Sequence, residues 1–392
     1  MIYYVNPSTP RFVTPTFLQI LTGELPEQAV QSPNLTVTRK RRDGVVPDSK
    51  TPDTFNAEDF ILALEQYRVF YDPLYSSERH SLYHTFRIPK KSGGLRKIDA
   101  PNDELKKALD ELKQLFDMKI GTKFHHTSAY AYVKERCPVD AVRCHQNNES
   151  EWFAKFDFSN FFGSTTMETV MRMASMIYPL NLVCASERGK TALKEALELA
   201  FLDGGLPQGT PISPFLTNLM MIPFDHEMTN YCGTHTPHYI YTRYADDIVV
   251  SCRQSFDFRE VEQKINSILG NFQMPFRIKA EKTHYCSRKG KNFILGVCLN
   301  KDNNITIGHR NKKVFESMLT HFATDTIGGT FWSLDDVYHL QGKISYYLSI
   351  ERDYINYLIR QYSTKFGVNI TETIKRQLKG ERVCIPQTKT HR

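Results

Sequence analysis

The chain has 392 residues, 41% hydrophobic and 24% charged, which is typical of an ordinary soluble globular chain with two or three compact units. No apolar run approaches the roughly 18 residues of a membrane span, and the first residues lack the basic-then-apolar order of a signal peptide, so we expect a cytoplasmic protein without a membrane partner. The net charge of +7 favours a polyanionic partner but does not identify one.

The N-terminal part is expected to begin with an irregular arm. Residues 1–55 are rich in Pro, Thr, Ser and Asn, and they include a basic run at 39–42 that is either a solvated loop or a phosphate-contacting arm. A helix is expected over 57–70, where apolar residues recur on one face after a possible Asn56 cap. The eight cysteines contain no C-x-x-C pair, so neither a zinc site nor a disulfide framework is expected.

A hairpin and a second helix are predicted next. Two short strand-like segments over 87–101 flank Ser-Gly-Gly and carry basic residues on both sides. An apolar stripe over 103–118 predicts a helix with a core-facing side. The segment FAKFDFSNFF then predicts a buried strand that ends at Asp157, followed by helices at 164–178 and 186–202.

The middle of the chain predicts a glycine-rich loop, a helix and a carboxylate hairpin. GLPQGTPISP at 205–214 is expected to be a loop, and a helix is expected after it with Ser213 or Thr210 near its cap. YIYTRYADDIVVSC at 239–252 predicts two strands that meet at Asp246 and Asp247, with both carboxylates presented by the turn.

The last third is predicted to begin with mixed structure and to end in helices. A helix is expected near 258–270, a strand at 276–280 and a paired strand at 292–299. From about 308 onward the sequence predicts basic helices.

Three carboxylates in this order point to metal-dependent phosphoryl transfer. Adjacent aspartates on a tight turn can hold a divalent metal ion, and a site that extends a nucleic acid usually needs a third carboxylate from another strand, which Asp157 supplies. Oxygen ligands suit Mg²⁺, and two ions about 4 Å apart can serve both the attacking and the leaving oxygen. The expected cofactor is therefore two Mg²⁺ ions, with Mn²⁺ as a possible substitute.

The order of carboxylate strand, helices, glycine-rich loop and carboxylate hairpin resembles the right-hand palm of reverse transcriptases over about residues 80–350. The resemblance implies an α+β right-hand polymerase fold. Its expected parts are an N-terminal extension at 1–79, fingers at 80–152, a palm at 153–304, which includes part of the fingers, and a helical thumb with the C-terminal tail at 305–392.

The resemblance also implies roles for the residues around the carboxylates. Asp157 matches the first metal ligand, and the main-chain carbonyl of Phe158 would assist it. Asp246 would be the second ligand and Asp247 the accompanying carboxylate. Tyr244 would lie near the primer end.

The incoming nucleotide has its own expected contacts. Phe162, five residues after Asp157, matches the aromatic steric gate that collides with a 2′-hydroxyl, so dNTPs are the expected substrates; core packing is the alternative role of this ring. Gln208 and Gly209 would touch the nucleotide. Lys90 and Arg96 have the six-residue separation of the pair that grips the triphosphate in group II intron and related bacterial enzymes, where cations neutralise developing charge.

Further residues match the family downstream of the hairpin. The resemblance makes Lys282 a candidate to protonate pyrophosphate, and it places Leu295 and Gly296 in the primer grip. Tyr346 and Tyr347, in the presumed thumb, would either contact nucleic acid or pack between helices.

Two departures indicate the branch of the family. Retron enzymes carry an Asn-Ala-x-x-His element, which here reads DAVRCH at 140–145 with an extra residue before His145, and a Val-Thr-Gly element, which is absent. Neither an RNase H domain nor a full set of maturase regions fits the chain. The sequence therefore resembles compact stand-alone bacterial reverse transcriptases associated with phage defence.

The expected function is to copy a cognate structured non-coding RNA into cDNA with dNTPs, in antiphage defence. An RNA-templated RNA polymerase is the first alternative, and the aromatic gate argues against it. A non-catalytic RNA-binding scaffold is the second, and the intact carboxylates argue against that. The template RNA, the priming mode, the product sequence and the oligomeric state stay open.

Overall fold

The computed structural model describes residues 3–4, 55–90, 93–121, 124–290 and 292–381, so the basic run at 39–42 lies outside the described residues. The chain divides into two compact units that alternate along the sequence. The first unit comprises residues 1–134, 157–231 and 259–280, and the second comprises residues 135–156, 232–258 and 281–392.

Two predicted helices of the first unit are confirmed. Helix α2 (Ala57–Phe70) begins after Asn56, whose side chain accepts hydrogen bonds from the first-turn N–H groups of the helix. Helix α4 (Asp103–Ile120) buries the predicted apolar stripe against the core. The other elements of this unit are β1 (Tyr3–Tyr4), α3 (Asp72–Tyr75), η1 (Arg79–Leu82), α6 (Phe161–Ser164), α8 (Leu180–Val183), α9 (Glu187–Leu197), η2 (Glu198–Ala200) and most of α12 (Phe258–Asn271).

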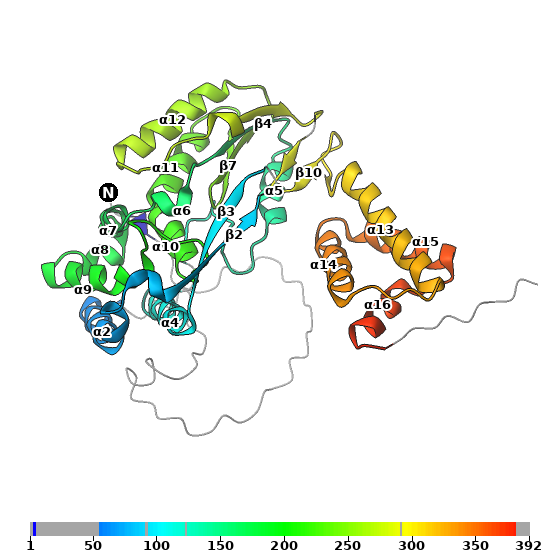
Figure 1. Cartoon of the computed structure of the whole chain (residues 1–392). Coiled ribbons are helices and arrows are strands. Elements are labelled where there is room, and N and C mark those ends of the chain that lie inside the picture. Colours follow the sequence, from blue (N-terminus) through cyan, green and yellow to red (C-terminus); the bar gives the residue numbers. More distant parts are fainter. Residues whose placement is uncertain (1–2, 5–54, 91–92, 122–123, 291, 382–392) are drawn as a thin grey trace, which may run out of the picture. The chain divides into compact units, whose positions relative to one another are not determined.

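The predicted hairpin is also present and is longer than expected. Strand β2 (Tyr83–Pro89) pairs antiparallel with β3 (Leu95–Pro101), and the two form a ribbon in Figure 1. Lys90 extends the pairing by donating its N–H to the Gly94 carbonyl at 3.0 Å. Both strands are largely exposed up to Lys97, so the outer part of the hairpin presents its side chains to solvent.

Two expectations for the helices of this unit were wrong. The helix expected over 164–178 is only α7 (Met167–Ala174), because residues 177 and 178 instead form β5 (Ile177–Tyr178) parallel to β1 and the following proline disfavours a helical Tyr178. The helix after the glycine-rich loop is divided into α10 (Ser213–Met220) and α11 (Ile222–Gly233), with a proline at the second residue of α11.

The second unit contains a four-stranded sheet with the order β6-β7-β4-β8. The predicted carboxylate hairpin is its pair β6 (Ile240–Tyr244) and β7 (Asp247–Cys252), and the predicted buried strand is β4 (Trp152–Asp157). Strand β8 (His284–Ser287) pairs antiparallel with β4. The remaining elements near this sheet in sequence are α5 (Pro138–Asn147), β9 (Phe293–Ile294), β10 (Val297–Leu299) and β11 (Ile305–Thr306).

The strand expected at 276–280 was wrong. Only an isolated bridge between Phe158 and Ile278 forms there, and the chain then enters the 3-10 helix η3 (Ala280–Lys282) before β8 begins. Regular pairing with β4 resumes only at His284, which lies opposite Lys155.

The predicted C-terminal helices are confirmed and form a bundle with a core of its own (Figure 1). Phe315, Phe322, Leu340 and Ile355 are fully buried in it. The Lys312 ammonium forms an ion pair with the Glu351 carboxylate at 2.6 Å. This pair joins the start of α13 to the residue between α14 and α15. The four helices are α13 (His309–Ile327), α14 (Leu334–Ile350), α15 (Arg352–Phe366) and α16 (Ile370–Leu378).

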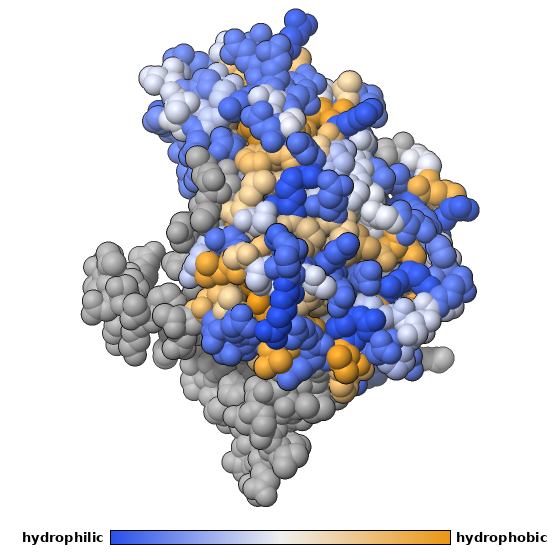
Figure 2. All heavy atoms as spheres, turned by 90° about the vertical axis from the view of Figure 1, so that its left-hand side faces the viewer, coloured by the Kyte–Doolittle hydropathy of each residue, from blue (hydrophilic) through white to orange (hydrophobic). Residues whose placement is uncertain are grey.

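Figure 2 shows hydrophilic residues over most of the face that it presents, with small apolar patches among them. Such scattered patches are normal for exposed protein surface. Among the helices of the described residues, none is both long and apolar enough to cross a bilayer.

Candidate active site

Asp157 lies at the end of β4 and is held in place by the segment around Ile278. The Lys279 N–H donates to the Asp157 carbonyl at 2.8 Å, and the Ser159 N–H donates to the Arg277 carbonyl at 2.9 Å. These two bonds flank the bridge between Phe158 and Ile278, and the Phe158 ring is fully buried. The backbone that carries the first predicted metal ligand is therefore fixed from both sides.

The YADD motif forms a two-residue turn that carries Asp246, and Asp247 begins β7 directly after it. Tyr244 pairs with Asp247, so the turn consists of Ala245 and Asp246. Ala245 has φ 56°, a left-handed conformation that costs a non-glycine residue roughly 1–2 kcal/mol. The fully buried Arg243 donates a hydrogen bond to the Ala245 carbonyl at 3.1 Å. Arg243, which the sequence motifs do not single out, thus stabilises the strained turn through its hydrogen bond to the Ala245 carbonyl.

The sheet order makes the two carboxylate-bearing strands neighbours. Strand β4 ends at Asp157, strand β7 begins at Asp247, and the two are adjacent in the sheet. Within the described part of the chain, no three His, Cys, Asp or Glu side chains are close enough to hold a metal ion. Convergence of all three carboxylates on metal therefore stays a prediction.

The donor chemistry at Asp157 nevertheless fits a divalent cation. Its Oδ1 atom lies 2.6 Å from the Lys279 ammonium, and the carboxylate is only 10% exposed. Carboxylate oxygens are the hard ligands that Mg²⁺ prefers, and Asp157 presents one at the end of a strand. The residues present therefore suit the metal that the sequence predicts.

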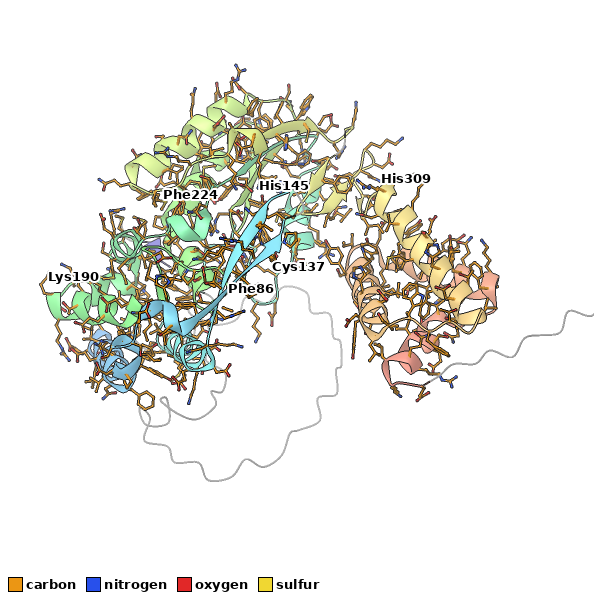
Figure 3. All side chains as sticks on the ribbon, viewed as in Figure 1. Phe86, Cys137, His145, Lys190, Phe224 and His309 are labelled. Atoms are coloured by element: carbon orange, nitrogen blue, oxygen red, sulfur yellow. The ribbon has the colours of Figure 1, made fainter. Side chains whose placement is uncertain are left out.

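Behind the YADD hairpin, a buried histidine joins both of its strands to α5 (Figure 3). His145 is fully buried; its Nδ1 lies 2.6 Å from the Ser251 hydroxyl, and its Nε2 lies 2.9 Å from the Thr242 hydroxyl. Ser251 donates onward to Ser150 at 2.8 Å. Because Ser251 uses its proton there, it accepts from Nδ1–H, and Thr242 donates to Nε2. The imidazole is therefore neutral and satisfied at both nitrogens.

Asp140 and His145, the two ends of the DAVRCH element, have separate structural contacts. Asp140, which stands where retron enzymes have Asn, accepts a hydrogen bond from the Cys137 N–H at 2.9 Å and so caps α5. His145 lies five residues later and faces the hairpin strands instead of solvent. The sequence showed the departure from the retron pattern, but it did not reveal this contact.

We expect His145 to make the folded protein sensitive to acid. Burial lowers the pKa of His145 to about 3, and the charge of Lys155 adds to this effect. Its contribution to stability is complete above the unfolded pKa of about 6.5 and is lost as the pH falls toward 3, at up to about 1.4 kcal/mol per pH unit. Urea unfolding should therefore show a smaller loss of stability between pH 6 and pH 4 in His145→Gln than in the wild type.

The matched control is His321→Gln on the exposed surface of α13, which should keep the pH dependence of the wild type. At pH 7, His145→Gln should cost about 1–3 kcal/mol, because a hydroxyl of the hairpin loses its partner. Parallel stability profiles for the wild type and His145→Gln would contradict the assigned network.

The glycine-rich loop packs directly on the segment that carries Phe162. The Leu206 N–H donates to the Phe162 carbonyl at 3.1 Å. A Cβ atom on Gly205 would lie 2.1 Å from the Gly163 carbonyl oxygen, so no other residue fits without moving the backbone. Ser213, which the sequence places near the cap of the following helix, is the first residue of α10 and directly follows the N-cap residue Ile212. Its hydroxyl donates to the Pro207 carbonyl at 2.9 Å, which holds the loop.

The same loop is fastened to the hairpin. The Asp99 N–H donates to the Gln208 carbonyl at 2.8 Å, and a Cβ on Gly209 would lie 2.8 Å from the Asp99 carbonyl oxygen. Asp99 is itself buried and accepts a hydrogen bond from Thr85 at 2.6 Å. The structure therefore places the predicted nucleotide-contacting residues of the loop at the base of the predicted triphosphate-binding hairpin.

Lys90 and Arg96 share one face of that hairpin. Ile88 lies opposite Arg96, and side chains two residues apart along a strand point to the same side. Both cationic residues are exposed. Lys97 points to the other face and forms ion pairs with Asp99 at 3.2 Å and Asp203 at 3.7 Å. The hairpin thus offers two solvent-facing cations on one side.

Phe162 is only partly buried. Its ring meets the rings of Tyr132 and Phe161 edge-on, with centroids 6.2 Å and 5.7 Å away. Phe161 instead lies in the core, 3% exposed, against Phe158 and Phe276. Of these two adjacent aromatics, Phe162 is the one with a face available to a ligand.

The predicted primer grip is a tight hairpin turn. Ile294 pairs with Val297, and the two turn residues, Leu295 and Gly296, have φ 54° and 80°, as a type I′ turn requires. The Tyr346 hydroxyl would lie 3.7 Å from a Cβ on Gly296.

Tyr346 and Tyr347, near the end of α14, have different environments. Burial raises the pKa of Tyr346, and the nearby Tyr244 hydroxyl raises it further, although 42% of Tyr346 remains exposed. Tyr347 is 5% exposed and packs edge-on against Phe315. Tyr346 of α14 thus lies near Tyr244 of the YADD motif and near the Leu295–Gly296 turn, whereas Tyr347 packs between helices.

Comparison with known proteins identifies the family. Residues 88–299, more than half of the chain, match the family described as "Reverse transcriptase (RNA-dependent DNA polymerase)". The chain belongs to the reverse transcriptase family. This confirms the expected α+β right-hand polymerase fold and RNA-directed DNA polymerase activity with an RNA template, and members of the family use divalent metal ions.

The relatives of this reverse transcriptase include bacterial retron enzymes. It is 27% identical over 316 residues to the Retron Ec83 reverse transcriptase of Escherichia coli, with 79% of this chain and 95% of the relative covered. It is also 27% identical over 278 residues to the Retron Ec73 reverse transcriptase of Escherichia coli, with 70% and 85% covered. The expected kinship with retron enzymes is confirmed, and the placement among stand-alone defence enzymes stays a prediction.

A solved structure similar to this reverse transcriptase is that of apo telomerase from Candida tropicalis, with a TM-score of 0.45 and 12% identity. The similarity covers 78% of this chain and 63% of the telomerase chain. This reverse transcriptase therefore spans less than two thirds of the length of that structure.

Proposed function

We propose that this reverse transcriptase extends a cDNA strand on a structured RNA by two-metal nucleotidyl transfer, and that it acts in antiphage defence. The observation that supports the chemistry is that β4, which ends at Asp157, and β7, which begins at Asp247, are neighbours in one sheet. Asp157 and Asp246 would be the main metal ligands, with Asp247 and the Phe158 carbonyl in support.

Two Mg²⁺ ions bound there would activate a primer 3′-hydroxyl and stabilise the leaving pyrophosphate. The chain's own residues would set the geometry. The Arg243 hydrogen bond holds the turn that carries Asp246, and the Lys279 main-chain bond holds Asp157. Lys282, exposed at the end of η3, is the proposed proton donor to pyrophosphate.

Nucleotide selection would rest on the first unit. Lys90 and Arg96 share a solvent-facing side of the hairpin and would bind the triphosphate, where cations neutralise charge in the transition state. Gln208 and Gly209 would contact the nucleotide from the loop at the hairpin base, and Phe162 would exclude the ribose 2′-hydroxyl. Tyr244 and the Leu295–Gly296 turn would position the primer end.

We expect the biological template to be one abundant non-coding RNA. Exposed cations on the hairpin and at the start of α13, including Arg310 and Lys313, suit phosphate contacts and shape recognition more than base readout. Immunoprecipitation from the native host, followed by sequencing, should recover one RNA encoded nearby and cDNA complementary to it, with more cDNA after phage infection.

The control is the same pull-down with Asp246→Ala/Asp247→Ala, which should retain the RNA and lose the cDNA. A deletion strain should become more sensitive to phage. If only a cross-section of cellular transcripts is recovered and the deletion strain resists phage as its parent does, the dedicated template and the defence role are both refuted.

A further inference from the structure

Lys279 makes two separate contacts with the first predicted metal ligand. Its main-chain N–H donates to the Asp157 carbonyl at 2.8 Å, and its ammonium lies 2.6 Å from Asp157 Oδ1. The backbone bridge between Phe158 and Ile278 determines this placement, because it sets Lys279 across from Asp157. The position of Lys279 opposite Asp157 is therefore set by backbone pairing and not by the side-chain ion pair alone.

The pair is shielded enough for its charge to matter. The Lys279 side chain is 25% exposed and that of Asp157 is 10% exposed. Ion pairs in such partly buried positions are screened by water and salt less than exposed pairs are. Lys282, three residues further along, is exposed and lies at the end of η3, so the two lysines of the IKAEKT segment have different surroundings.

We propose that Lys279 is a positioning residue that competes with the catalytic metal for Asp157. Its ammonium neutralises the carboxylate and holds its Oδ1 atom, so a divalent ion must share that oxygen with a cation or displace the ammonium. The lysine thereby weakens metal binding and makes it depend on what else enters the site, such as a metal-bound nucleotide. This inference rests on the proposed role of Asp157 as a metal ligand.

The test measures Mn²⁺ binding to the full chain without nucleotide or RNA, by electron paramagnetic resonance of free Mn²⁺. Lys279→Gln removes the charge and keeps a polar side chain, and it should tighten the Mn²⁺ dissociation constant about tenfold, since a nearby like charge no longer opposes the ion. Lys279→Met should lower the Mn²⁺ dissociation constant by a similar factor. Lys279→Arg keeps the positive charge and should keep the wild-type dissociation constant. The two uncharged variants give the same comparison if one of them fails to fold.

The chain offers a closely matched control in Lys312, whose ammonium lies 2.6 Å from Glu351 with side chains that are 23% and 19% exposed. Lys312→Gln removes an equivalent ion pair away from the predicted metal ligands. It should leave the Mn²⁺ dissociation constant unchanged.

Asp157→Asn separates the two levels of the proposal. If it binds Mn²⁺ as the wild type does, Asp157 is not a ligand and the proposed function fails with the inference. If Asp157→Asn loses affinity while Lys279→Gln and Lys279→Met bind Mn²⁺ no more tightly than the wild type, the competition by Lys279 is refuted and the metal site stands.

Discussion

The double variant Asp246→Ala/Asp247→Ala should reduce dNTP incorporation by at least about 10³-fold. It removes carboxylates that would hold the metal ions, and those ions stabilise the charge on the phosphate that is transferred. The fold should survive, since both side chains lie at a turn and are only partly buried. The measurement is incorporation of labelled dNTP on a primed RNA, together with thermal unfolding and RNA affinity.

The matched control is Asp302→Asn, which alters another exposed turn carboxylate in the same unit. It should leave incorporation near the wild-type rate. Normal incorporation by the folded double variant would show that the turn carboxylates do not serve the reaction.

Phe162→Val should change sugar selection by about 10²-fold in favour of ATP, measured as the ratio of kcat/KM for dATP and ATP. The partly exposed ring would no longer collide with a 2′-hydroxyl, so the ribonucleotide gains much more than the deoxyribonucleotide loses. The substitution also removes the edge-on contacts of the ring with Tyr132 and Phe161. Because Phe162 is only partly buried, the variant should still fold.

Phe161→Leu is the matched control, since it shortens the adjacent aromatic, which is buried against Phe158 and Phe276. It should lower the free energy of unfolding by about 1 kcal/mol or more. The ratio of kcat/KM for dATP and ATP should stay unchanged. An unchanged ratio in folded Phe162→Val would assign that ring to packing alone.

The sequence predicted the elements whose signals are local. The Asn56 cap, the apolar stripe of α4 and the two strands that meet at YADD depend on neighbouring residues, and all three appear in the structure. The helix expected over 164–178 is shorter because residues 177 and 178 pair with a distant strand, although Pro179 was a local signal against a helical Tyr178.

The missed site residues depend on contacts between distant segments. Lys279 contacts Asp157 because an isolated bridge joins Phe158 to Ile278, two residues that lie 120 positions apart in the sequence. His145 of α5 contacts Ser251 and Thr242 on two strands of the sheet. A lysine or a histidine in a sequence gives no sign of such a partner. Arg243 had a usable signal, since an arginine within an otherwise apolar strand needs a buried acceptor.

RNA-templated synthesis by the purified full chain tests the central claim most directly. With a primed RNA, dNTPs and Mg²⁺, the wild type should make a product that DNase degrades and RNase does not, and Asp157→Asn should make none. A product only with rNTPs, or equal synthesis by Asp157→Asn, would contradict an RNA-directed DNA polymerase whose chemistry depends on the carboxylate at the end of β4.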